Sequence, residues 1–342
     1  MKLPPVSAQP RISEIVESLA AAGLDAILVT HAPNVRYLSG FSGSSAMLLV
    51  TPTATMLSTD GRYAQRAQAE VEAVGVDLDD LVIGNPQTQL AQLACSLAGG
   101  ARIGLEADHI AWGRASSLVE GALSEFDVVP TSSLIETVRL RKDPAEIARM
   151  RRAAEIASAS LTRTIEAGLI GRSERELVIE IEQSMVELGA GGASFPTIVA
   201  TGFNAANPHA LPGNSVVAEG DLVVFDLGAE VDGYCSDMTR TLPVGALTSD
   251  RELALQVVTQ AQQRGVDALG PGVDTADVDA ACRDYLTAEG FGEFFVHGTG
   301  HGVGLDIHEQ PFLGSTTTGV LEEGMVVTVE PGVYLPGRHG AR

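Results

Sequence analysis

Hydrophobic spacing in residues 1–135 switches repeatedly between helical and strand patterns. Apolar residues recur at helical spacing in Arg11–Ala22, which stops at Gly23, whereas Ala26–Thr30 is a short apolar run typical of a strand. Further helices are expected at Ala64–Val74 and Gln87–Leu97, and further strands at Ala46–Val50, Thr53–Ser58 and Arg102–Leu105. This alternation predicts a separate α/β domain over residues 1–135.

Two helices with N-terminal caps are expected to open a second domain, residues 136–342. Asp143, Pro144 and Glu146 fall at the N-cap, first and third positions of a long helix. The segment Ser173-Glu174-Arg175-Glu176 forms a capping box for a second helix, which reaches Leu188.

Strand patterns are frequent in the remainder of the chain. Strands are expected at Ser194–Thr201, Leu222–Leu227, Tyr234–Leu242 and Met325–Val329, the last of them buried, and helices at about 250–269 and 275–288. Asp232-Gly233 is a hairpin turn signal between two of these strands. The second domain is therefore predicted to be α+β, with helices packed on a curved, mostly antiparallel sheet.

Composition narrows the classes of partner. The chain has 342 residues, 45% of them hydrophobic and 19% charged, which suits two folded domains. A net charge of −22 disfavours binding to nucleic acid or to anionic membranes. No apolar run reaches the roughly 18 residues that cross a bilayer, and the N-terminus lacks an export signal. The three cysteines are far apart, which argues against a disulfide framework or a thiolate zinc site and favours a reducing cytoplasm.

Two aspartates in the predicted hairpin are the first candidates for chemistry. Asp226 lies inside the apolar strand Leu222–Leu227, where a charge is costly unless it is paired, hydrogen-bonded or bound to a metal. Asp237 follows across the turn, and two such carboxylates repel each other unless they share a proton or a cation. Asp237 alone fits a surface aspartate equally well, but the pair favours a cation site.

Three histidines, His297, His301 and His308, lie within the run His297–Glu309. The glycines between them let the backbone approach a ligand closely, and neutral imidazole is a common metal ligand and proton carrier. His301 is the best ligand candidate because it is central in the glycine-rich run. Taken singly, His209 or His297 is more typical of a hydrogen-bonded loop histidine.

Glu330 completes an oxygen-rich set of four candidate metal ligands. It directly follows the predicted strand Met325–Val329, although a glutamate at a strand end can also simply face solvent. Two aspartates, one histidine and one glutamate favour Mn²⁺, Fe²⁺ or Co²⁺ over a thiolate type of zinc site. Bridging carboxylates suit two ions about 3.5–4 Å apart, which acidify water and polarise a carbonyl.

Together these segments resemble the proline-specific metallopeptidases of the pita-bread (creatinase/aminopeptidase) fold. The resemblance rests on the run His297–Glu309, the Asp226/Asp237 hairpin and Val329-Glu330-Pro331-Gly332, and is greatest to Xaa-Pro dipeptidases (prolidases) and Xaa-Pro aminopeptidases (aminopeptidase P). Two further segments, Asn34–Phe41 and Thr59–Tyr63, resemble the creatinase-type N-terminal domain of that family. The single-domain methionine aminopeptidases lack this domain.

The resemblance implies a metal centre with four ligands in this chain, Asp226, Asp237, His301 and Glu330. Asp226 would chelate one ion, Asp237 would bridge two, and His301 and Glu330 would bind the other. Mn²⁺ is the expected metal, with Co²⁺, Fe²⁺ and Zn²⁺ as alternatives.

The resemblance also implies catalytic and substrate-binding residues. Glu330 is the expected proton acceptor and donor, and His308 is expected to steady the tetrahedral intermediate. His297 and His209 would line the substrate and proline pocket, and Arg342 is a further substrate-binding candidate.

The end of the sequence departs from the family pattern. The family's fifth ligand is a Glu two positions after an Arg, and Gly340-Ala341-Arg342 matches only the start of that segment. A chain without this Glu and the last strand of the sheet is expected to bind metal weakly and to turn over little. Such a chain would be a truncated form, or a short protein with an impaired or single-metal site.

The sequence therefore predicts metal-dependent hydrolysis of the peptide bond before proline in short peptides, by a cytoplasmic homodimer whose N-terminal domain supplies the dimer contact. Two alternatives stay open: a catalytically impaired or non-enzymatic protein of the same fold, and a creatinase-like C–N hydrolase. The four retained ligands argue against both alternatives, whereas the missing fifth ligand favours the impaired form.

Overall fold

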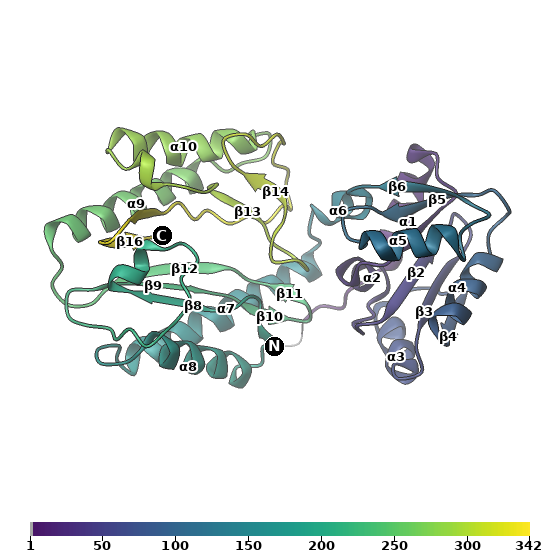
Figure 1. The fold of residues 1–342 in the computed structure, drawn as a ribbon, viewed down its shortest axis with the longest axis horizontal. Helices are drawn as coiled ribbons and strands as arrows, with labels where there is room; N and C mark the ends of the chain where they lie inside the picture. Colours follow the sequence, from purple (N-terminus) through teal and green to yellow (C-terminus); the bar gives the residue numbers. More distant parts are fainter. Residues whose placement is uncertain (1–2) are drawn as a thin grey trace. The chain divides into compact units, whose positions relative to one another are not determined.

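A computed structural model describes residues 3–342, which divide after Arg139 into two compact units (Figure 1). The division falls after Arg139 rather than after residue 135, because α6 (Leu134–Arg139) packs on α1 (Gln9–Ala22). Arg139 is buried, and its Nη1 donates a hydrogen bond of 2.6 Å to Oδ1 of Asn34. No helix among residues 3–342 is both long and apolar enough to cross a membrane.

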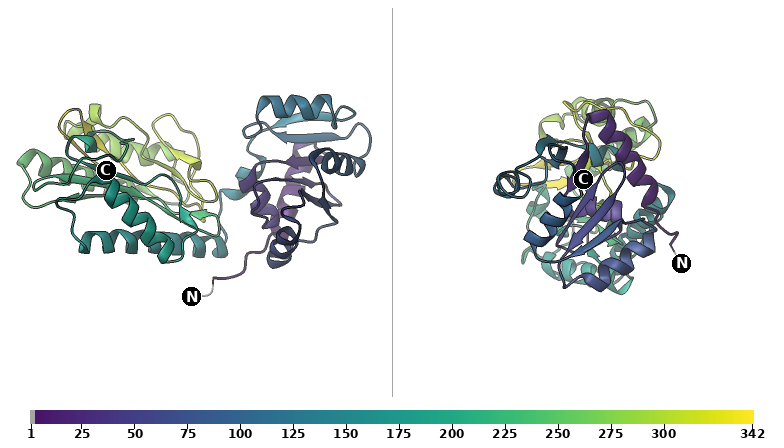
Figure 2. Two further views of the ribbon diagram at one scale, coloured as in Figure 1. Left: turned by 60° about the horizontal axis from the view of Figure 1, so that its bottom comes forward. Right: turned by 90° about the vertical axis from the view of Figure 1, so that its right-hand side faces the viewer.

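The first unit is built on a mixed six-stranded sheet with the strand order β4-β3-β2-β1-β5-β6. Its strands are β1 (Ala26–Val29), β2 (Ala46–Val50), β3 (Thr55–Thr59), β4 (Asp80–Ile83), β5 (Arg102–Glu106) and β6 (Asp127–Thr131). Its further helices are α2 (Ala32–Ser39), α3 (Ala64–Val74), α4 (Pro86–Cys95) and α5 (Trp112–Glu120). Helices lie on both faces of the sheet (Figure 2), which confirms the predicted α/β architecture.

Five elements of this unit are not predicted from the sequence, namely α2, β4, α5, β6 and α6. The strands β4 and β6 form the two edges of the sheet and are largely exposed, so they carry no clear apolar alternation. Pro130 in β6 lacks a backbone N–H, which is tolerated only at such an edge. The helix α2 has 8 residues, too few for its periodicity to stand out.

The second unit places four long helices against short antiparallel strands. The helices are α7 (Pro144–Glu166), α8 (Glu174–Glu187), α9 (Ser249–Ala268) and α10 (Thr275–Ala288). The strands are β7 (Gly192–Ala193), β8 (Ile198–Thr201), β9 (Leu222–Leu227), β10 (Ala229–Val231), β11 (Tyr234–Cys235), β12 (Met238–Pro243), β13 (Gly300–Gly302), β14 (Glu309–Leu313), β15 (Val333–Leu335) and β16 (His339–Ala341). The helices α7 and α8 contact β10 and β8, whereas α9 and α10 contact β16 and β14 (Figure 1). This arrangement confirms the predicted α+β domain.

The prediction of a buried strand at Met325–Val329 is wrong. Backbone hydrogen bonds join Val326, Thr328 and Glu330 to residues 299–303 around a bridge between Gly302 and Val327, but the side chains of the segment are only half-buried. Its Val326–Val329 portion lines a cavity of about 800 Å³, so among the described residues no strand covers that side. The apolar run is thus paired with residues 299–303 on one side and forms the wall of this cavity on the other, so it is not buried as predicted.

The helix α7 begins at the predicted capping box. The carboxylate of Asp143 accepts the N–H groups of Ala145 at 2.7 Å and Glu146 at 2.8 Å, and the N–H of Asp143 donates to Oε2 of Glu146 at 3.0 Å. Pro144 takes the first helical position, where no N–H is needed. These contacts pair N–H groups that the helix itself cannot satisfy, and so they anchor the start of the unit.

Substitution of Asp143 by Ala is expected to lower the free energy of unfolding by about 1 kcal/mol, because the cap hydrogen bonds are lost. Denaturant unfolding followed by helix circular dichroism measures the change. The matched control is Asp274→Ala, since Asp274 is the N-cap of α10 but its side chain makes no cap hydrogen bond. Equal losses for the two variants would contradict this account of the cap.

Candidate metal centre and substrate pocket

The strands β9 and β12 bring the two predicted aspartates to one face of the sheet. In their antiparallel register Asp226 lies opposite Thr239, so Asp237, two residues earlier, lies diagonally across from Asp226 on the same face. The turn between β10 and β11 has Asp232 at φ 48° and Gly233 at φ 79°, as the hairpin signal predicts. A local turn thus sets the geometry of two residues eleven positions apart.

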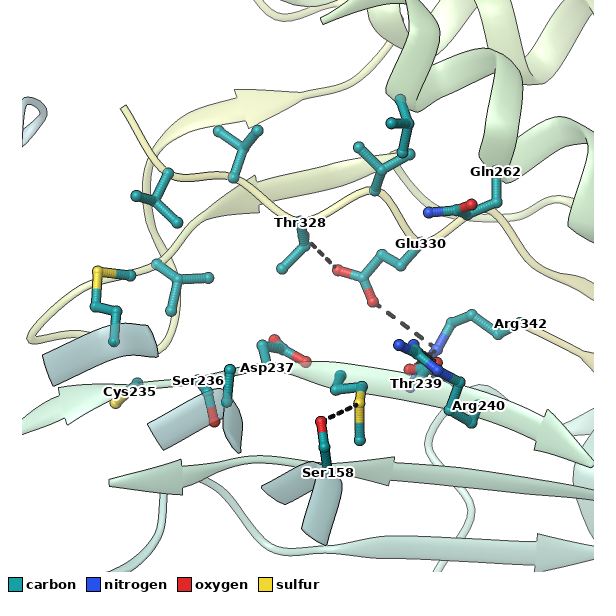
Figure 3. A pocket seen from close by; sticks show the side chains of 18 of the residues that line it. Ser158, Cys235, Ser236, Asp237, Thr239, Arg240, Gln262, Thr328, Glu330 and Arg342 are labelled. Carbon is teal, nitrogen blue, oxygen red and sulfur yellow. Dashed lines mark hydrogen bonds and ion pairs between the residues drawn. The ribbon is translucent and has the colours of Figure 1, made fainter. Parts of the chain in front are cut away.

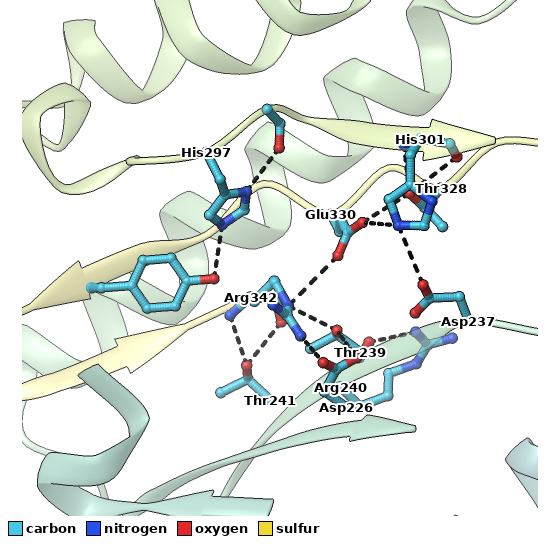
Figure 4. Close-up of polar contacts among 12 residues, drawn as sticks. Asp226, Asp237, Thr239, Arg240, Thr241, His297, His301, Thr328, Glu330 and Arg342 are labelled. Carbon is cyan, nitrogen blue, oxygen red and sulfur yellow. Dashed lines mark hydrogen bonds and ion pairs between the residues drawn. The ribbon is translucent and has the colours of Figure 1, made fainter. Parts of the chain in front are cut away.

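Asp237, His301 and Glu330 converge from three distant segments (Figure 4). Their potential ligand atoms lie within 4.8 Å of one another. Nε2 of His301 is 3.4 Å from Oδ2 of Asp237 and 3.2 Å from Oε1 of Glu330. No other group of three His, Cys, Asp or Glu side chains within residues 3–342 meets in this way. Two carboxylates and one imidazole suit a divalent cation.

Hydrogen bonds fix the orientation of the His301 ring. Nδ1 lies 2.9 Å from the carbonyl oxygen of Gly302 and donates to it, which directs Nε2 toward the carboxylates. The backbone N–H of His301 donates to the hydroxyl of Thr328 at 3.0 Å, and that hydroxyl donates to Oε1 of Glu330 at 2.9 Å. Thr328 therefore ties the histidine and the glutamate together.

Charge compensation within this cluster shifts its pKa values. Burial lowers the pKa of His301, but hydrogen bonds with Asp237 and Glu330 outweigh burial and raise the pKa to about 10. Burial raises the pKa of Glu330, but the hydrogen bond from His301 and the positive charge of Arg342 hold it below its ordinary value. A protonated His301 thus places one positive charge between the two carboxylates and reduces their repulsion.

Asp226 does not join the three-ligand group, because its Oδ2 pairs with Nη2 of Arg342. The Thr239 hydroxyl donates to the other oxygen of Asp226 at 3.0 Å, and Nε of Arg342 lies 3.8 Å from Oε2 of Glu330. Burial raises the pKa of Asp226 more than Arg342 lowers it. Arg342 therefore places a positive charge between Asp226 and Glu330, near the position predicted for a second ion.

A cavity of about 1040 Å³ adjoins the cluster. Its lining includes every residue that the sequence singles out for the site, namely His209, Asp226, Asp237, His297, His301, His308, Glu330 and Arg342. The structure thus gathers the predicted residues around one cavity, although only three of them form the ligand group.

The other site histidines surround the ligand group. The ring of His308 packs edge-on against that of His301 with centroids 4.4 Å apart, and burial together with the charge of His301 lowers the pKa of His308. Nε2 of His297 lies 2.9 Å from the hydroxyl of Tyr334, and burial lowers the pKa of His297. Burial raises the pKa of Tyr334 to about 12, so its hydroxyl stays protonated at neutral pH. His209 is exposed on the wall of the cavity.

The cavity of about 800 Å³ reaches the same cluster along a different wall (Figure 3). It lies among α7, α9, β12 and the segment 326–330, and it shares Asp237, Glu330 and Arg342 with the cavity of about 1040 Å³. Apolar side chains such as Met150 and Val258 line it. Spacing along the chain does not predict this cavity, because its walls come from segments far apart in the sequence.

Sequence reasoning missed the buried ion pair behind His308. Nζ of Lys142 lies 2.6 Å from Oε1 of Glu309, and the two side chains are 1% and 8% exposed. Glu309 directly follows His308, so the ion pair fixes one end of the turn that carries this histidine. Because 167 positions separate the two residues, no local pattern could connect them.

Replacement of Lys142 by Met is expected to lower the free energy of unfolding by about 3–5 kcal/mol, because the buried Glu309 loses its cation. The double variant Lys142→Met/Glu309→Gln removes both charges and is expected to regain most of this loss. Denaturant unfolding compares the variants. A loss of less than about 1 kcal/mol in the single variant would contradict a strongly coupled buried pair.

In the metal-free protein, His301 is expected to make stability depend on pH. Its pKa rises from 6.5 in the unfolded chain to about 10 on folding, so its stabilisation is complete below about pH 6.5 and is lost as the pH rises to about 10. Unfolding with a chelator present is compared for the wild type and His301→Gln. The stability difference between them should shrink from about pH 6 to about pH 10, and a constant difference would refute the coupling.

Comparisons with known proteins identify the family of the chain. The creatinase/prolidase N-terminal domain matches residues 11–141 and the metallopeptidase family M24 matches residues 148–342. The Xaa-Pro dipeptidase of Pyrococcus horikoshii is 32% identical over 335 residues, which cover 97% of this chain and 92% of that protein. The structure of the Xaa-Pro dipeptidase from Bacillus anthracis superposes with a TM-score of 0.90 at 37% identity, covering 97% of this chain and 92% of that one.

The X-Pro aminopeptidase from Thermotoga maritima has a TM-score of 0.85 at 30% identity, covering 95% of this chain and 92% of that one. These matches extend over both units and confirm the resemblance drawn from the motifs. The chain therefore belongs to metallopeptidase family M24, with a creatinase/prolidase N-terminal domain ahead of a pita-bread catalytic domain.

Proposed function

We propose that the protein hydrolyses the peptide bond before proline in short peptides, as an Xaa-Pro dipeptidase or aminopeptidase. The observation that carries the proposal is the convergence of Asp237, His301 and Glu330 beside a cavity lined by three further histidines. The names of the related proteins, Xaa-Pro dipeptidase and X-Pro aminopeptidase, support the choice of substrate.

Asp237, His301 and Glu330 would hold a divalent ion, and Mn²⁺ is proposed because carboxylate-rich donor sets suit hard ions. When bound, such an ion polarises the scissile carbonyl and acidifies water. A second ion would use Asp226 and Asp237, and Arg342 would have to leave Asp226 first. We therefore expect a metal titration to show that the second ion binds more weakly than the first.

Glu330 is proposed as the group that moves the proton. Its Oε1 contacts His301 and Thr328, and its Oε2, which lies 3.8 Å from Nε of Arg342, would accept the proton of the attacking water. The lowered pKa of Glu330 keeps the carboxylate ionised for this step. The same oxygen then returns the proton to the proline nitrogen as the C–N bond breaks.

His308 is proposed to stabilise the oxyanion that forms on the substrate carbonyl. Its lowered pKa keeps the imidazole neutral near pH 7, so one ring N–H can donate a hydrogen bond. His297, His209 and Arg342 line the cavity and are proposed to bind the remainder of the peptide. Proline lacks an N–H and has a fixed ring, so a dedicated pocket can recognise it by shape.

We also propose that the protein works as a cytoplasmic homodimer. Three free cysteines suit a reducing compartment. Sedimentation equilibrium tests the dimer, and fractionation of cells that express a tagged chain tests the compartment.

The decisive assay uses an Xaa-Pro dipeptide, an Xaa-Pro tripeptide and the same peptides with alanine in place of proline, with and without Mn²⁺. Only the proline peptides are expected to be cleaved, and only with metal. Asp237→Asn should lower kcat/KM by at least about 100-fold, because it removes a metal ligand. Asp277→Asn removes an exposed carboxylate on α10 and should leave the rate unchanged.

Three results would reject the proposal. Equal cleavage of the alanine peptides would remove the proline specificity. Metal-independent hydrolysis of a creatine-like substrate, which breaks its C–N bond and releases urea, would favour the C–N hydrolase. Failure both to bind Mn²⁺ and to cleave any peptide would favour the catalytically impaired protein.

A further inference from the structure

The loop that carries His297 is attached to the helix α10 at three backbone points. Nη1 of Arg283 donates to the carbonyl of Phe295 at 3.1 Å, and Nη2 donates to the carbonyl of His297 at 2.7 Å. Oδ1 of Asp279 accepts the backbone N–H of Thr299 at 3.0 Å. Two side chains one helical turn apart therefore hold the loop on both sides of the histidine.

Asp279 and Arg283 also hold each other in a two-bond ion pair. Nε of Arg283 lies 2.7 Å from Oδ2 of Asp279, and Nη2 lies 3.0 Å from Oδ1. Asp279 is 0% exposed, and it also accepts the hydroxyl of Thr299 at 2.9 Å. A paired, charge-assisted arrangement of this kind is strong and directional, so the loop is fixed to a rigid helix rather than to another loop.

Backbone hydrogen bonds connect the loop at Thr299 to the segment that carries the candidate metal ligand Glu330. The carbonyl of Thr299 accepts the backbone N–H of Glu330 at 2.8 Å, and the carbonyl of His301 accepts the N–H of Thr328 at 2.8 Å. A Cβ at Gly300 would collide with the carbonyl oxygen of Thr328, so the two backbones can approach this closely only with glycine there. The position of residues 299–301 therefore sets the position of Glu330.

We propose that Asp279 and Arg283 are positioning residues that hold His297 and Glu330 in register on the substrate cavity. The catalytic part of this inference rests on the proposed peptidase function. Asp279 is fully buried and cannot touch a substrate. Arg283 lines the cavity, but its hydrogen bonds to Asp279, Phe295 and His297 engage four of the five N–H groups that a guanidinium offers.

The kinetic test compares Asp279→Asn, Arg283→Gln and the double variant on an Xaa-Pro dipeptide. Each single variant should lower kcat/KM by about tenfold or more, because a misplaced Glu330 slows the chemistry and a misplaced His297 weakens peptide binding. The double variant should lose no more than the worse single variant, because the pair acts as a unit. The control Asp284→Asn, an exposed carboxylate on the same helix, should keep wild-type kinetics.

Amide hydrogen exchange in the metal-free protein tests the positioning without any activity. The amides of Thr299 and Glu330 should exchange at least about tenfold faster in Asp279→Asn, whereas amides in α8 should not change. If the wild type cleaves no Xaa-Pro peptide, the proposed function fails, and the exchange result still decides on the positioning role.

Three outcomes would overturn the inference. Unchanged exchange at Thr299 and Glu330 would show that the ion pair does not hold the loop. Faster exchange throughout the domain would reduce the pair to a general structural role. Arg283 would instead contact the substrate directly if Arg283→Gln raised KM and the double variant lost the product of the two single-variant losses in kcat/KM.

Discussion

Repulsion among buried carboxylates is the constraint on which the site depends. Asp226, Asp237 and Glu330 all line one cavity, and such a group is stable only with positive charge among its members. His301 lies between two of these carboxylates, and Arg342 pairs with the third. A divalent ion would supply the same compensation from the same place. The arrangement therefore requires positive charge among the carboxylates, which either a protonated His301 or a bound divalent ion can supply.

Other buried carboxylates hold the loops around the site by accepting hydrogen bonds from their backbone N–H groups. Glu174 is 0% exposed and accepts the N–H groups of Thr201 and Gly213, each at 2.9 Å. These two residues flank the loop that carries His209. Asp279 likewise accepts the backbone N–H of Thr299 and so holds the loop that carries His297. Loops that surround the cavity of about 1040 Å³ are thus held by side chains that belong to the ends and faces of helices.

Local features of the site could be predicted, and long-range ones could not. The hairpin of Asp226 and Asp237 follows from a turn signal and the period of a strand, which fix its register. The pairing of Asp226 with Arg342 joins segments far apart in the chain, and no spacing rule reaches that far. The apolar run Met325–Val329 predicts a buried strand, but it forms a half-buried wall of a cavity. The hydrophobic pattern cannot distinguish the two, because an apolar run suits a neighbouring strand and a cavity equally well.

The most direct test of this account is anomalous diffraction from crystals of the protein soaked with Mn²⁺. The account predicts a manganese peak within about 2.0–2.3 Å of a carboxylate oxygen of Asp237, Nε2 of His301 and a carboxylate oxygen of Glu330. A structure with Mn²⁺ bound elsewhere, and with His301 still hydrogen-bonded between the two carboxylates, would contradict it.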